Sequence, residues 1–204
     1  MKEMWDKRYS SESYVYGTAP NCFFAEELEN LKEGKLLLPA EGEGRNAVYA
    51  AKKGWDVVAF DQSKVAKGKA DKLAERQAVQ IDYRVAEFNE IFFEPASFDA
   101  IALVYAHFPS HKMSSYHRQL DKYLKIGGII ILEGFSKSHP EVSKNNERPM
   151  GPPDRSMLYS IGDIERDFDN YEMITLREEQ LCLNEGAFHV GQGAVIRFVG
   201  KKLS

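Results

Sequence analysis

Short apolar runs alternate with amphipathic segments along the first two thirds of the chain. The apolar runs have strand length and read KLLLPA (35–40), WDVVAFD (55–61), IDYRVAEF (81–88), SFDAIALVYAHF (97–108) and IIILEGF (129–135). Segments with helical spacing lie between several of these runs, at 46–54, 63–78 and 111–125, and another precedes them at 25–31. Nearly continuous apolar strands joined through helices indicate a parallel sheet that is covered on both faces.

The pattern changes after residue 135. Residues 136–157 are rich in Pro, Ser, Asn and charge, which predicts a long loop on the side of the active site. A short helix follows, with Ser160 and Asp163 placed as its capping residues. The segments 171–183 and 193–202 predict two strands. No helix fits between them, so they should pair as an antiparallel hairpin with 184–192 as its loop.

Length and charge narrow the class of protein. The 204 residues suit one domain spanning 1–204, with 1–31 as an N-terminal cap segment. A net charge of -4 argues against binding of nucleic acid mainly through its phosphates. The lysine-rich stretch 63–72 is interpreted as a solvated helix face.

The two cysteines and the short apolar runs indicate the cellular compartment and whether a metal is bound. Cys22 and Cys182 have neither metal-ligand nor disulfide spacing, so we expect no metal and two buried thiols in a reducing compartment. The first residues, MKEMWDKRY, lack an apolar leader segment, and the longest aliphatic run covers only 129–132. The expected protein is therefore cytoplasmic and does not associate with membranes.

A glycine turn stands between the first apolar run and the first helix, in LLLPAEGEGRNAVYAA (36–51). Doubly wound sheets bind nucleotides at this point, where the amides of a helix start favour negative groups. Asp61 ends the second strand 19 positions after Gly42, where a carboxylate can accept both hydrogen bonds of a ribose diol. Gly42 and Gly44 would let the backbone approach a nucleoside. This spacing fits both a dinucleotide and S-adenosylmethionine (SAM).

Two features favour SAM over a dinucleotide. Glu41 and Glu43 would repel a pyrophosphate, whereas a carboxylate can help to hold the ammonium group of SAM. The closing antiparallel hairpin is also foreign to dinucleotide-binding domains. An NAD-dependent oxidoreductase would need a Tyr-x-x-x-Lys or similar proton donor, and the nearest match, Tyr159 to Asp163, lacks the lysine.

The chain resembles the class I SAM-dependent methyltransferases, in the group related to tellurite-resistance methyltransferases. The resemblance covers nearly the whole chain and rests on an ordered set of segments: WDKRY, YGTAPNCFF, EGEGRNAVYAA, FDQS, SFDAIALVYAHFP, LKIGGIIILEGF and LNEGAFHVGQGAVIRFVGKK. It implies a Rossmann-like α/β fold with a doubly wound seven-stranded sheet in the order 3-2-1-4-5-7-6, strand 7 being antiparallel. One departure is that many relatives carry an acid inside the first strand, where this chain has LLLPA and then Glu41.

The resemblance implies a set of residues around SAM. Gly42 and Gly44 would face the methionyl part and the ribose, Asp61 the ribose hydroxyls and Gln62 the adenine. Glu87 would accept from the adenine amine, and Phe88 would offer its backbone amide. Trp5, Arg8 and Tyr9 would close over the cofactor, Arg8 pairing with its carboxylate, although a helix that only packs on the sheet is an alternative. The full expected set is Trp5, Arg8, Tyr9, Glu41, Gly42, Gly44, Asn46, Asp61, Gln62, Glu87, Phe88 and Tyr105.

The predicted function is methyl transfer to a small-molecule acceptor, such as a thiol or a chalcogen oxyanion like tellurite or selenite, by a monomer or homodimer. An anionic acceptor needs no base, whereas an amine or hydroxyl does, and the candidates are His107 and His189, with Glu185 near the second. Arg148 and Arg155 in the long loop are candidates for attracting an anion, or plain surface charges. The alternatives are an NAD-dependent oxidoreductase and a non-catalytic SAM-binding protein.

Overall fold

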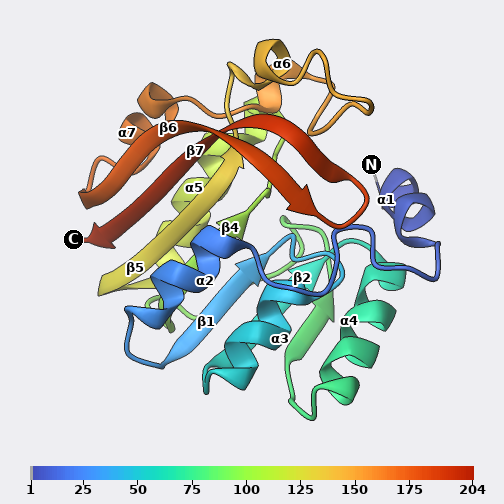
Figure 1. The fold of residues 1–204 in the computed structure, drawn as a ribbon. Helices are drawn as coiled ribbons and strands as arrows, with labels where there is room; N and C mark the ends of the chain where they lie inside the picture. The colour runs from blue at the N-terminus through green and yellow to red at the C-terminus, as the bar shows by residue number, and fades with distance from the viewer. Residues whose placement is uncertain (1) are drawn as a thin grey trace.

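A single seven-stranded sheet forms the centre of the computed structural model, which describes residues 2–204 (Figure 1). The strand order is β3-β2-β1-β4-β5-β7-β6, and β7 runs antiparallel to both of its neighbours. The expected order and the antiparallel last strand are thereby confirmed. The strands are β1 (Lys35–Pro39), β2 (Asp56–Asp61), β3 (Asp82–Val85), β4 (Phe98–Val104), β5 (Leu124–Phe135), β6 (Tyr171–Glu185) and β7 (His189–Lys202).

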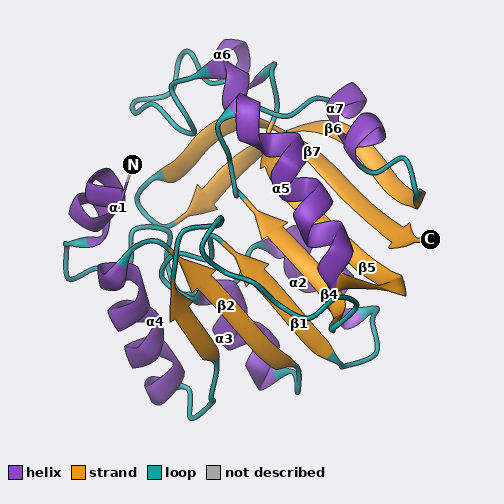
Figure 2. Cartoon of the chain, turned by 180° about the vertical axis from the view of Figure 1, so that it is seen from behind, coloured by secondary structure: helices purple, strands orange, loops and turns teal. Residues whose placement is uncertain are grey.

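Helices cover both faces of this sheet. They are α1 (Lys2–Tyr9), α2 (Cys22–Glu29), α3 (Arg45–Lys52), α4 (Lys64–Arg76), α5 (Ser110–Tyr123), α6 (His139–Val142) and α7 (Ile161–Asp167). Leu36 and Leu38 pack with α2, α3 and α4, whereas Leu37 between them packs with α5 and α7. This alternation follows from the two-residue period of a strand. Figure 2 shows α5 on the face opposite to α2 and α3.

Several element boundaries differ from the sequence expectation. The helix predicted at 111–125 ends at Tyr123, because β5 begins at Leu124 and pairs with Phe98. The helix expected at 25–31 is α2, which begins earlier because the Asn21 side chain accepts from the Phe24 amide and caps it. The cap predicted for α7 is confirmed, since Ser160 accepts from the Asp163 amide.

The hairpin is longer than its sequence pattern suggests. Glu185 pairs with His189 next to the turn, and Tyr171 pairs with Lys202 at the other end of the hairpin. Only residues 186–188 therefore form the turn. His189, expected in a loop, is therefore the first residue of β7. The segment 136–157 is mostly irregular but contains α6 and a 3-10 turn at Arg155–Met157, and Asn146 in it bonds to the backbone of Gln192 in β7.

The expectation for the two cysteines is wrong. Cys22 and Cys182 are both exposed free thiols rather than small buried side chains. Cys22 is the first residue of α2, and Cys182 lies on the half-exposed edge strand β6. Composition alone could not place them, because a lone cysteine carries no pattern.

The N-terminal segment is tied to the glycine turn and to the hairpin. The Glu43 carboxylate accepts from the Val15 amide at 2.7 Å and from the Lys69 ammonium of α4 at 2.6 Å. The Ala187 amide in the hairpin turn donates to the Val15 carbonyl at 2.9 Å. In Figure 1, α1 lies beside the end of the β6–β7 hairpin and above α4. Residues 9–17 thus connect three parts of the carboxyl edge of the sheet.

A buried hydrogen-bonded pair of side chains joins α5 to α7 and offers a test of the fold. His117 Nδ1 lies 2.8 Å from Asp167 Oδ2, and both side chains are almost fully buried. Burial raises the pKa of Asp167, but hydrogen bonds from His117 and Ser114 outweigh it and bring that pKa down to about 2. Above pH 4 the ionised carboxylate therefore stabilises the fold, and this contribution is lost as the pH falls from about 4 toward 2.

Asp167→Asn is expected to lower the free energy of unfolding by about 3 kcal/mol at pH 7, since it breaks a buried pair. Urea unfolding at several pH values measures this, with Asp169→Asn, an exposed neighbour, as the control. The loss of stability of the wild type between pH 4 and 2 should be smaller in the Asp167 variant. An equal pH dependence in both proteins would contradict the assigned role.

Candidate functional site

Two non-glycine residues with left-handed backbone mark the carboxyl edge of the sheet. Ala40 follows β1 with a φ of 52°, and Tyr105 follows β4 with a φ of 52°. Such angles are unusual for residues with a side chain, above all for an aromatic one, and strained residues gather at functional sites. Both turns lie at the switch point between β1 and β4, where sheets of this kind bind ligands.

Glu41 caps helix α3 from the preceding turn. One of its carboxylate oxygens accepts from the backbone amides of Asn46 and Ala47, each at 2.8 Å. Its other oxygen accepts from the Asn46 side-chain nitrogen at 3.3 Å. The side-chain oxygen of Asn46 in turn accepts from the backbone amide of Asn21. Glu41 and Asn46 were both expected to contact the cofactor. Their side chains instead form hydrogen bonds at the start of α3. Glu41 thus shapes the turn between β1 and α3.

Burial raises the pKa of Glu41 to about 7 against the opposing effect of its hydrogen bonds. A carboxyl group with a raised pKa in the folded state makes the protein less stable as the pH rises from about 4.5 to 7. Glu41→Gln keeps an oxygen for the two amides and removes the charge. Its free energy of unfolding should therefore exceed that of the wild type by about 1–3 kcal/mol at pH 8 and approach it at pH 5.

Chemical denaturation at both pH values tests this prediction. Glu41→Ala serves as the comparison, because it removes the cap as well as the charge and should be less stable than the wild type at pH 5. If Glu41→Gln were no more stable than the wild type at pH 8, the buried carboxylate would carry no such penalty.

The two glycines of the turn serve different purposes. A Cβ on Gly42, whose φ is 64°, would stand 2.8 Å from the Tyr9 hydroxyl, so the backbone there is approached by the N-terminal segment. A Cβ on Gly44, whose φ is 87°, would stand 2.5 Å from the Ala70 Cβ of α4. Gly44 therefore allows two helices to pack closely, a different reason from the ligand approach expected for it.

Asp61 ends β2 beside the glycine turn, as expected. Its carboxylate accepts from the Gly42 amide at 3.2 Å and from the Ser63 amide at 2.9 Å. Burial raises the pKa of Asp61 to about 6 in spite of these bonds. Each oxygen keeps a further lone pair, so the group suits a ligand that donates two hydrogen bonds. Gly42 and Asp61 together form a cradle whose carboxylate can accept further hydrogen bonds.

Three aromatic and basic residues of the N-terminal segment gather above this cradle. The Trp5 and Tyr9 rings stack at 5.4 Å, and burial and the nearby Asp61 carboxylate raise the pKa of Tyr9. The Arg8 guanidinium donates to the Tyr16 hydroxyl at 3.1 Å and lies 5.0 Å from the Trp5 ring. Of these residues, Tyr9 lies directly against Gly42, Trp5 stacks on Tyr9, and Arg8 contacts Trp5 and Tyr16.

The expected adenine contacts are less concentrated. Phe88 is a core residue whose ring stacks on Tyr116 at 4.0 Å and meets Phe60 edge to face. Glu87 is exposed, and its amide donates to Glu90 within the same turn. Gln62 follows Asp61 and is partly exposed. The Gln62 and Glu87 side chains are thus the accessible ones at this end of β2 and β3.

His189, the first residue of β7, lies against Tyr105, which follows β4. Its ring centroid is 4.5 Å from that of Tyr16 and 4.4 Å from that of Tyr105. Its Nδ1 lies 3.4 Å from the Glu185 carboxylate, which also pairs with Arg45 at 2.9 Å. Burial lowers the pKa of His189. Burial raises the pKa of Glu185, but the hydrogen bonds from His189 and Arg45 and the charge of Arg45 outweigh it and bring that pKa to about 2. The arrangement presents a neutral imidazole oriented by an ionised carboxylate.

A buried acid in β5 organises this end of the site and was missed from the sequence. Glu133 accepts from Asn21 at 2.6 Å, from the Tyr105 hydroxyl at 2.9 Å and from Arg197 at 2.6 Å. Asn21 also donates to Glu185 at 3.0 Å, so the helix cap, two strands and the hairpin share one network. A lone acid inside the apolar run IIILEGF was the available sequence signal.

The expectation that His107 acts as a base does not agree with its contacts. Its Nδ1 lies 2.9 Å from the Met157 carbonyl, and its Nε2 accepts from the Phe135 amide at 3.1 Å. Both ring nitrogens are thus engaged by the backbone, and removal from water lowers the pKa of His107 to about 4. The side chain therefore joins the segment before α7 to β5 through these two hydrogen bonds.

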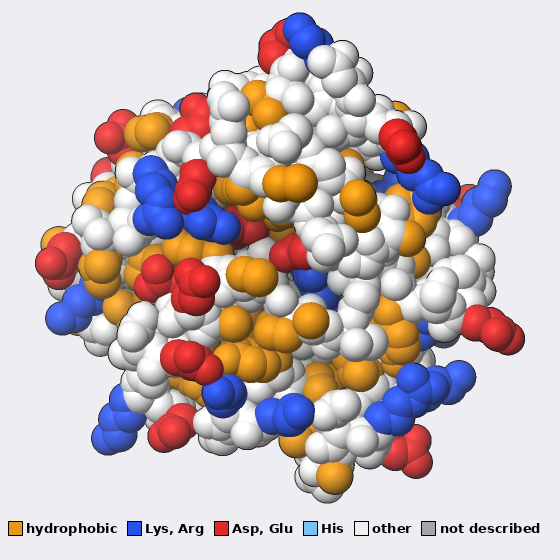
Figure 3. Space-filling model, viewed as in Figure 1, with side chains coloured by type: hydrophobic (Ala, Val, Ile, Leu, Met, Phe, Trp, Pro, Cys, Tyr) orange, Lys and Arg blue, Asp and Glu red, His pale blue; other side chains and the backbone are white. Residues whose placement is uncertain are grey.

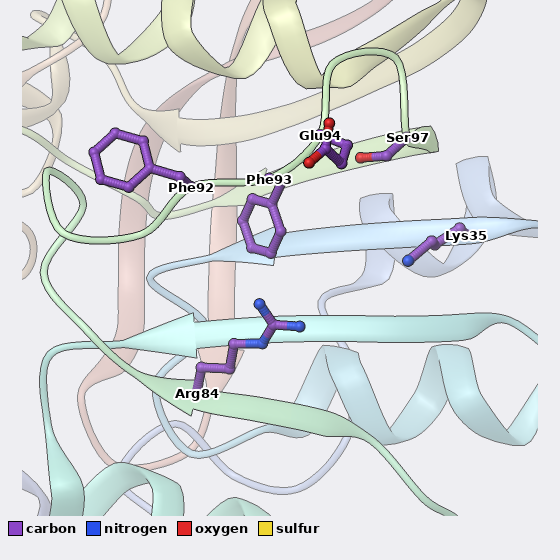
Figure 4. Close-up of a pocket in the computed structure, with 6 residues that line it drawn as sticks. All are labelled: Lys35, Arg84, Phe92, Phe93, Glu94 and Ser97. Atoms are coloured by element: carbon purple, nitrogen blue, oxygen red, sulfur yellow. The ribbon is translucent and has the colours of Figure 1, made fainter.

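A surface hollow lies away from the expected site residues. Its volume is about 360 Å³, and Figure 4 shows its lining: Lys35, Arg84, Phe92, Phe93, Glu94 and Ser97. None of the expected site residues borders it. Figure 3 shows acidic and basic side chains interspersed over the face in view, with no broad basic area there. Within residues 2–204, no helix has both the length and the apolar character needed to cross a membrane.

Comparisons with known proteins agree with this geometry. Residues 39–128 match a family model described as a methyltransferase domain. The search of curated proteins by sequence gave no match.

Solved structures resemble the whole chain. One, described as "Conversion of a Disulfide Bond into a Thioacetal Group during Echinomycin Biosynthesis", has a TM-score of 0.77 at 17% identity and covers 100% of this chain and 92% of its own. TehB from Haemophilus influenzae has a TM-score of 0.72 at 15% identity, over 98% of this chain and 66% of its own. A SAM-dependent methyltransferase from Methanosarcina mazei has a TM-score of 0.65 at 16% identity, over 87% and 97%.

The matched residues include Gly42 and Asp61, which form the cradle described above, and Tyr105. The sheet order differs from that of dinucleotide-binding domains by the inserted β7, so the NAD alternative has no support in the fold. Residues 39–128 thus match a methyltransferase domain, and the chain has the fold of solved SAM-dependent methyltransferases.

Proposed function

We propose that this protein methylates a small-molecule acceptor, with a thiol as the favoured class and a chalcogen oxyanion as the alternative. The observation that carries the proposal is the enclosure of His189 by Tyr16 and Tyr105 directly beyond the end of β4. The distant structural relative with a TM-score of 0.77 is described by a reaction at sulfur, which supports the same class.

Asp61, Gly42 and the N-terminal segment would hold SAM at the end of β1 and β2. Asp61 would accept from the ribose hydroxyls, and Tyr9 or Trp5 would border the sulfonium, which aromatic faces attract. When bound, SAM supplies an electrophilic methyl carbon on a positively charged sulfur. The aromatic rings around the cleft exclude water, and Tyr105 and His189 orient an acceptor beside that methyl group.

His189 would take the proton of the acceptor. Glu185 lies on Nδ1 and leaves Nε2 as the position that faces a proton donor. Because its pKa is lowered by burial, the imidazole is neutral near pH 7 and can act as a base. A thiol would lose its proton to Nε2 as its sulfur forms the bond to the methyl carbon, while the bond from that carbon to the sulfonium breaks and S-adenosylhomocysteine is left. An oxyanion would need Arg8 or Arg45 for attraction and would not need His189.

To test this, the protein is incubated with SAM and a panel of acceptors. Mass spectrometry measures the S-adenosylhomocysteine and the methylated product that are released. Small thiols, selenite, tellurite and a catechol are offered in parallel. Turnover with thiols supports the favoured class, and turnover only with oxyanions selects the alternative. SAM binding without turnover on any acceptor would favour a non-catalytic SAM-binding protein.

A further inference from the structure

A groove of about 600 Å³ lies between α4 and the chain that follows α1. Four of its lining residues, Lys64, Gly68, Lys72 and Arg76, succeed one another at intervals of four and so share one side of α4. The opposite wall is formed by residues 9–12 and Tyr14. Of this lining, the methyl-transfer site uses Tyr9 alone, so the lysine-rich stretch 63–72 has no role in that site.

The cations along this side of α4 are available for a ligand. Lys64, Lys72 and Arg76 are exposed, and they form no ion pair with any residue in the described range 2–204. Glu12 is the one carboxylate among the residues that line the groove. The groove therefore has a positive balance, in contrast to the net charge of -4 of the whole chain.

The deeper cation of the groove is already neutralised. Lys69 is buried and donates to Glu43 at 2.6 Å and to the Ser13 carbonyl at 2.7 Å. Lys67, which is not part of the lining, pairs with Asp71 at 2.6 Å. Lys69 and Lys67 are thus paired, whereas Lys64, Lys72 and Arg76 along the groove form no ion pair within residues 2–204.

This side of α4 is also unfavourable for the helix itself. Gly68 stands in mid-helix although a Cβ there would meet nothing within 4 Å, so packing does not require a glycine. Lys72 and Arg76 are like charges one turn apart, which weakens a helix. Departures from helix preference without a packing reason are typical of functional surfaces. The absent side chain at Gly68 keeps the floor of the groove open between Lys64 and Lys72.

We propose that this groove binds a small multivalent anion that carries phosphate or carboxylate groups. Lys64 and Arg76 are twelve residues apart, so the row of cations is about 18 Å long and can meet several negative groups of one molecule. Arg76 offers the paired donors that suit phosphate and carboxylate, and the Tyr14 ring beside it provides an apolar wall.

Such a ligand would also hold the N-terminal segment in place. The Tyr14 hydroxyl donates to the Lys69 carbonyl at 2.9 Å, and the neighbouring residues 10–12 form part of the outer wall of the groove. An anion that contacts both walls ties this segment to α4. Amide hydrogen exchange of residues 10–14 should therefore slow when the anion is bound.

The experiment is calorimetric titration of pyrophosphate and of citrate at low ionic strength, on the full chain without SAM. Lys72→Gln/Arg76→Gln should weaken binding by about tenfold or more, because two charge-assisted contacts are lost. Lys52→Gln/Lys67→Gln removes the same charge outside the groove and should change the affinity less than about twofold. Gly68→Glu, which places a carboxylate on the groove floor, should abolish binding.

Thermal unfolding without ligand establishes that the variants are folded. Preference for pyrophosphate or for citrate identifies the phosphate or the carboxylate as the favoured group, and either supports the proposal. Absence of binding to the wild type would overturn it. So would equal weakening by the two double variants, because it would show that the anions respond only to net charge.

Discussion

Replacing His189 with Asn is expected to lower kcat with a thiol acceptor by about 100-fold at pH 7, the effect typical of losing a general base. Asn keeps a polar side chain between Tyr16 and Tyr105 but cannot take a proton at neutral pH. The wild-type rate should rise with pH through a pKa below 6.5, because the neutral imidazole is the active form and burial lowers its pKa. The variant should lack this rise.

The pH profile distinguishes a base from a residue that only packs. The deficit of His189→Asn should shrink above about pH 8.5, where free thiols ionise without help. Glu185→Gln, which removes the carboxylate on Nδ1, should lower kcat by about tenfold and shift the acid limb. His107→Asn serves as the comparison and should affect stability more than the pH profile. A constant deficit of His189→Asn at every pH would refute the base assignment.

Replacing Asp61 with Asn is expected to raise the dissociation constant of SAM by about 30–100-fold, because two hydrogen bonds to a charged acceptor are lost or weakened. The amide also turns a donor toward either the Gly42 or the Ser63 amide, which both now donate to Asp61. Equilibrium dialysis or calorimetry with SAM measures the change.

Asp56→Asn is the matched control, since this exposed residue begins the same strand at the opposite end of the sheet. The unfolding midpoint of both variants separates a lost ligand contact from a distorted turn. An unchanged SAM affinity in Asp61→Asn, together with lower stability, would leave Asp61 a purely structural role.

The sequence predicted the fold and the place of Asp61 beside the glycine turn. Strand, turn and helix signals around Gly42 and Asp61 are local, so their contacts could be anticipated from position. Gly44 was correctly expected in the turn, but its packing partner, Ala70, comes from another helix. A spacing pattern cannot reveal a contact of that kind.

The other half of the cleft depends on tertiary contacts. Glu133, Asn21 and Arg45 meet only because β5, the cap of α2, the start of α3 and the hairpin converge. His107 and His189 looked equivalent in the sequence, and only their hydrogen-bond partners separate them. Chemistry that is assembled from distant segments therefore needed the structure.

Thermal unfolding with SAM, S-adenosylhomocysteine and NADH in parallel tests the central claim most directly. A ligand at about 100 times its dissociation constant adds about 2.7 kcal/mol of stability. For a chain of 204 residues this raises Tm by about 5–10 °C. The account predicts a shift with SAM and with S-adenosylhomocysteine but none with NADH. A shift with NADH alone would contradict the methyltransferase assignment.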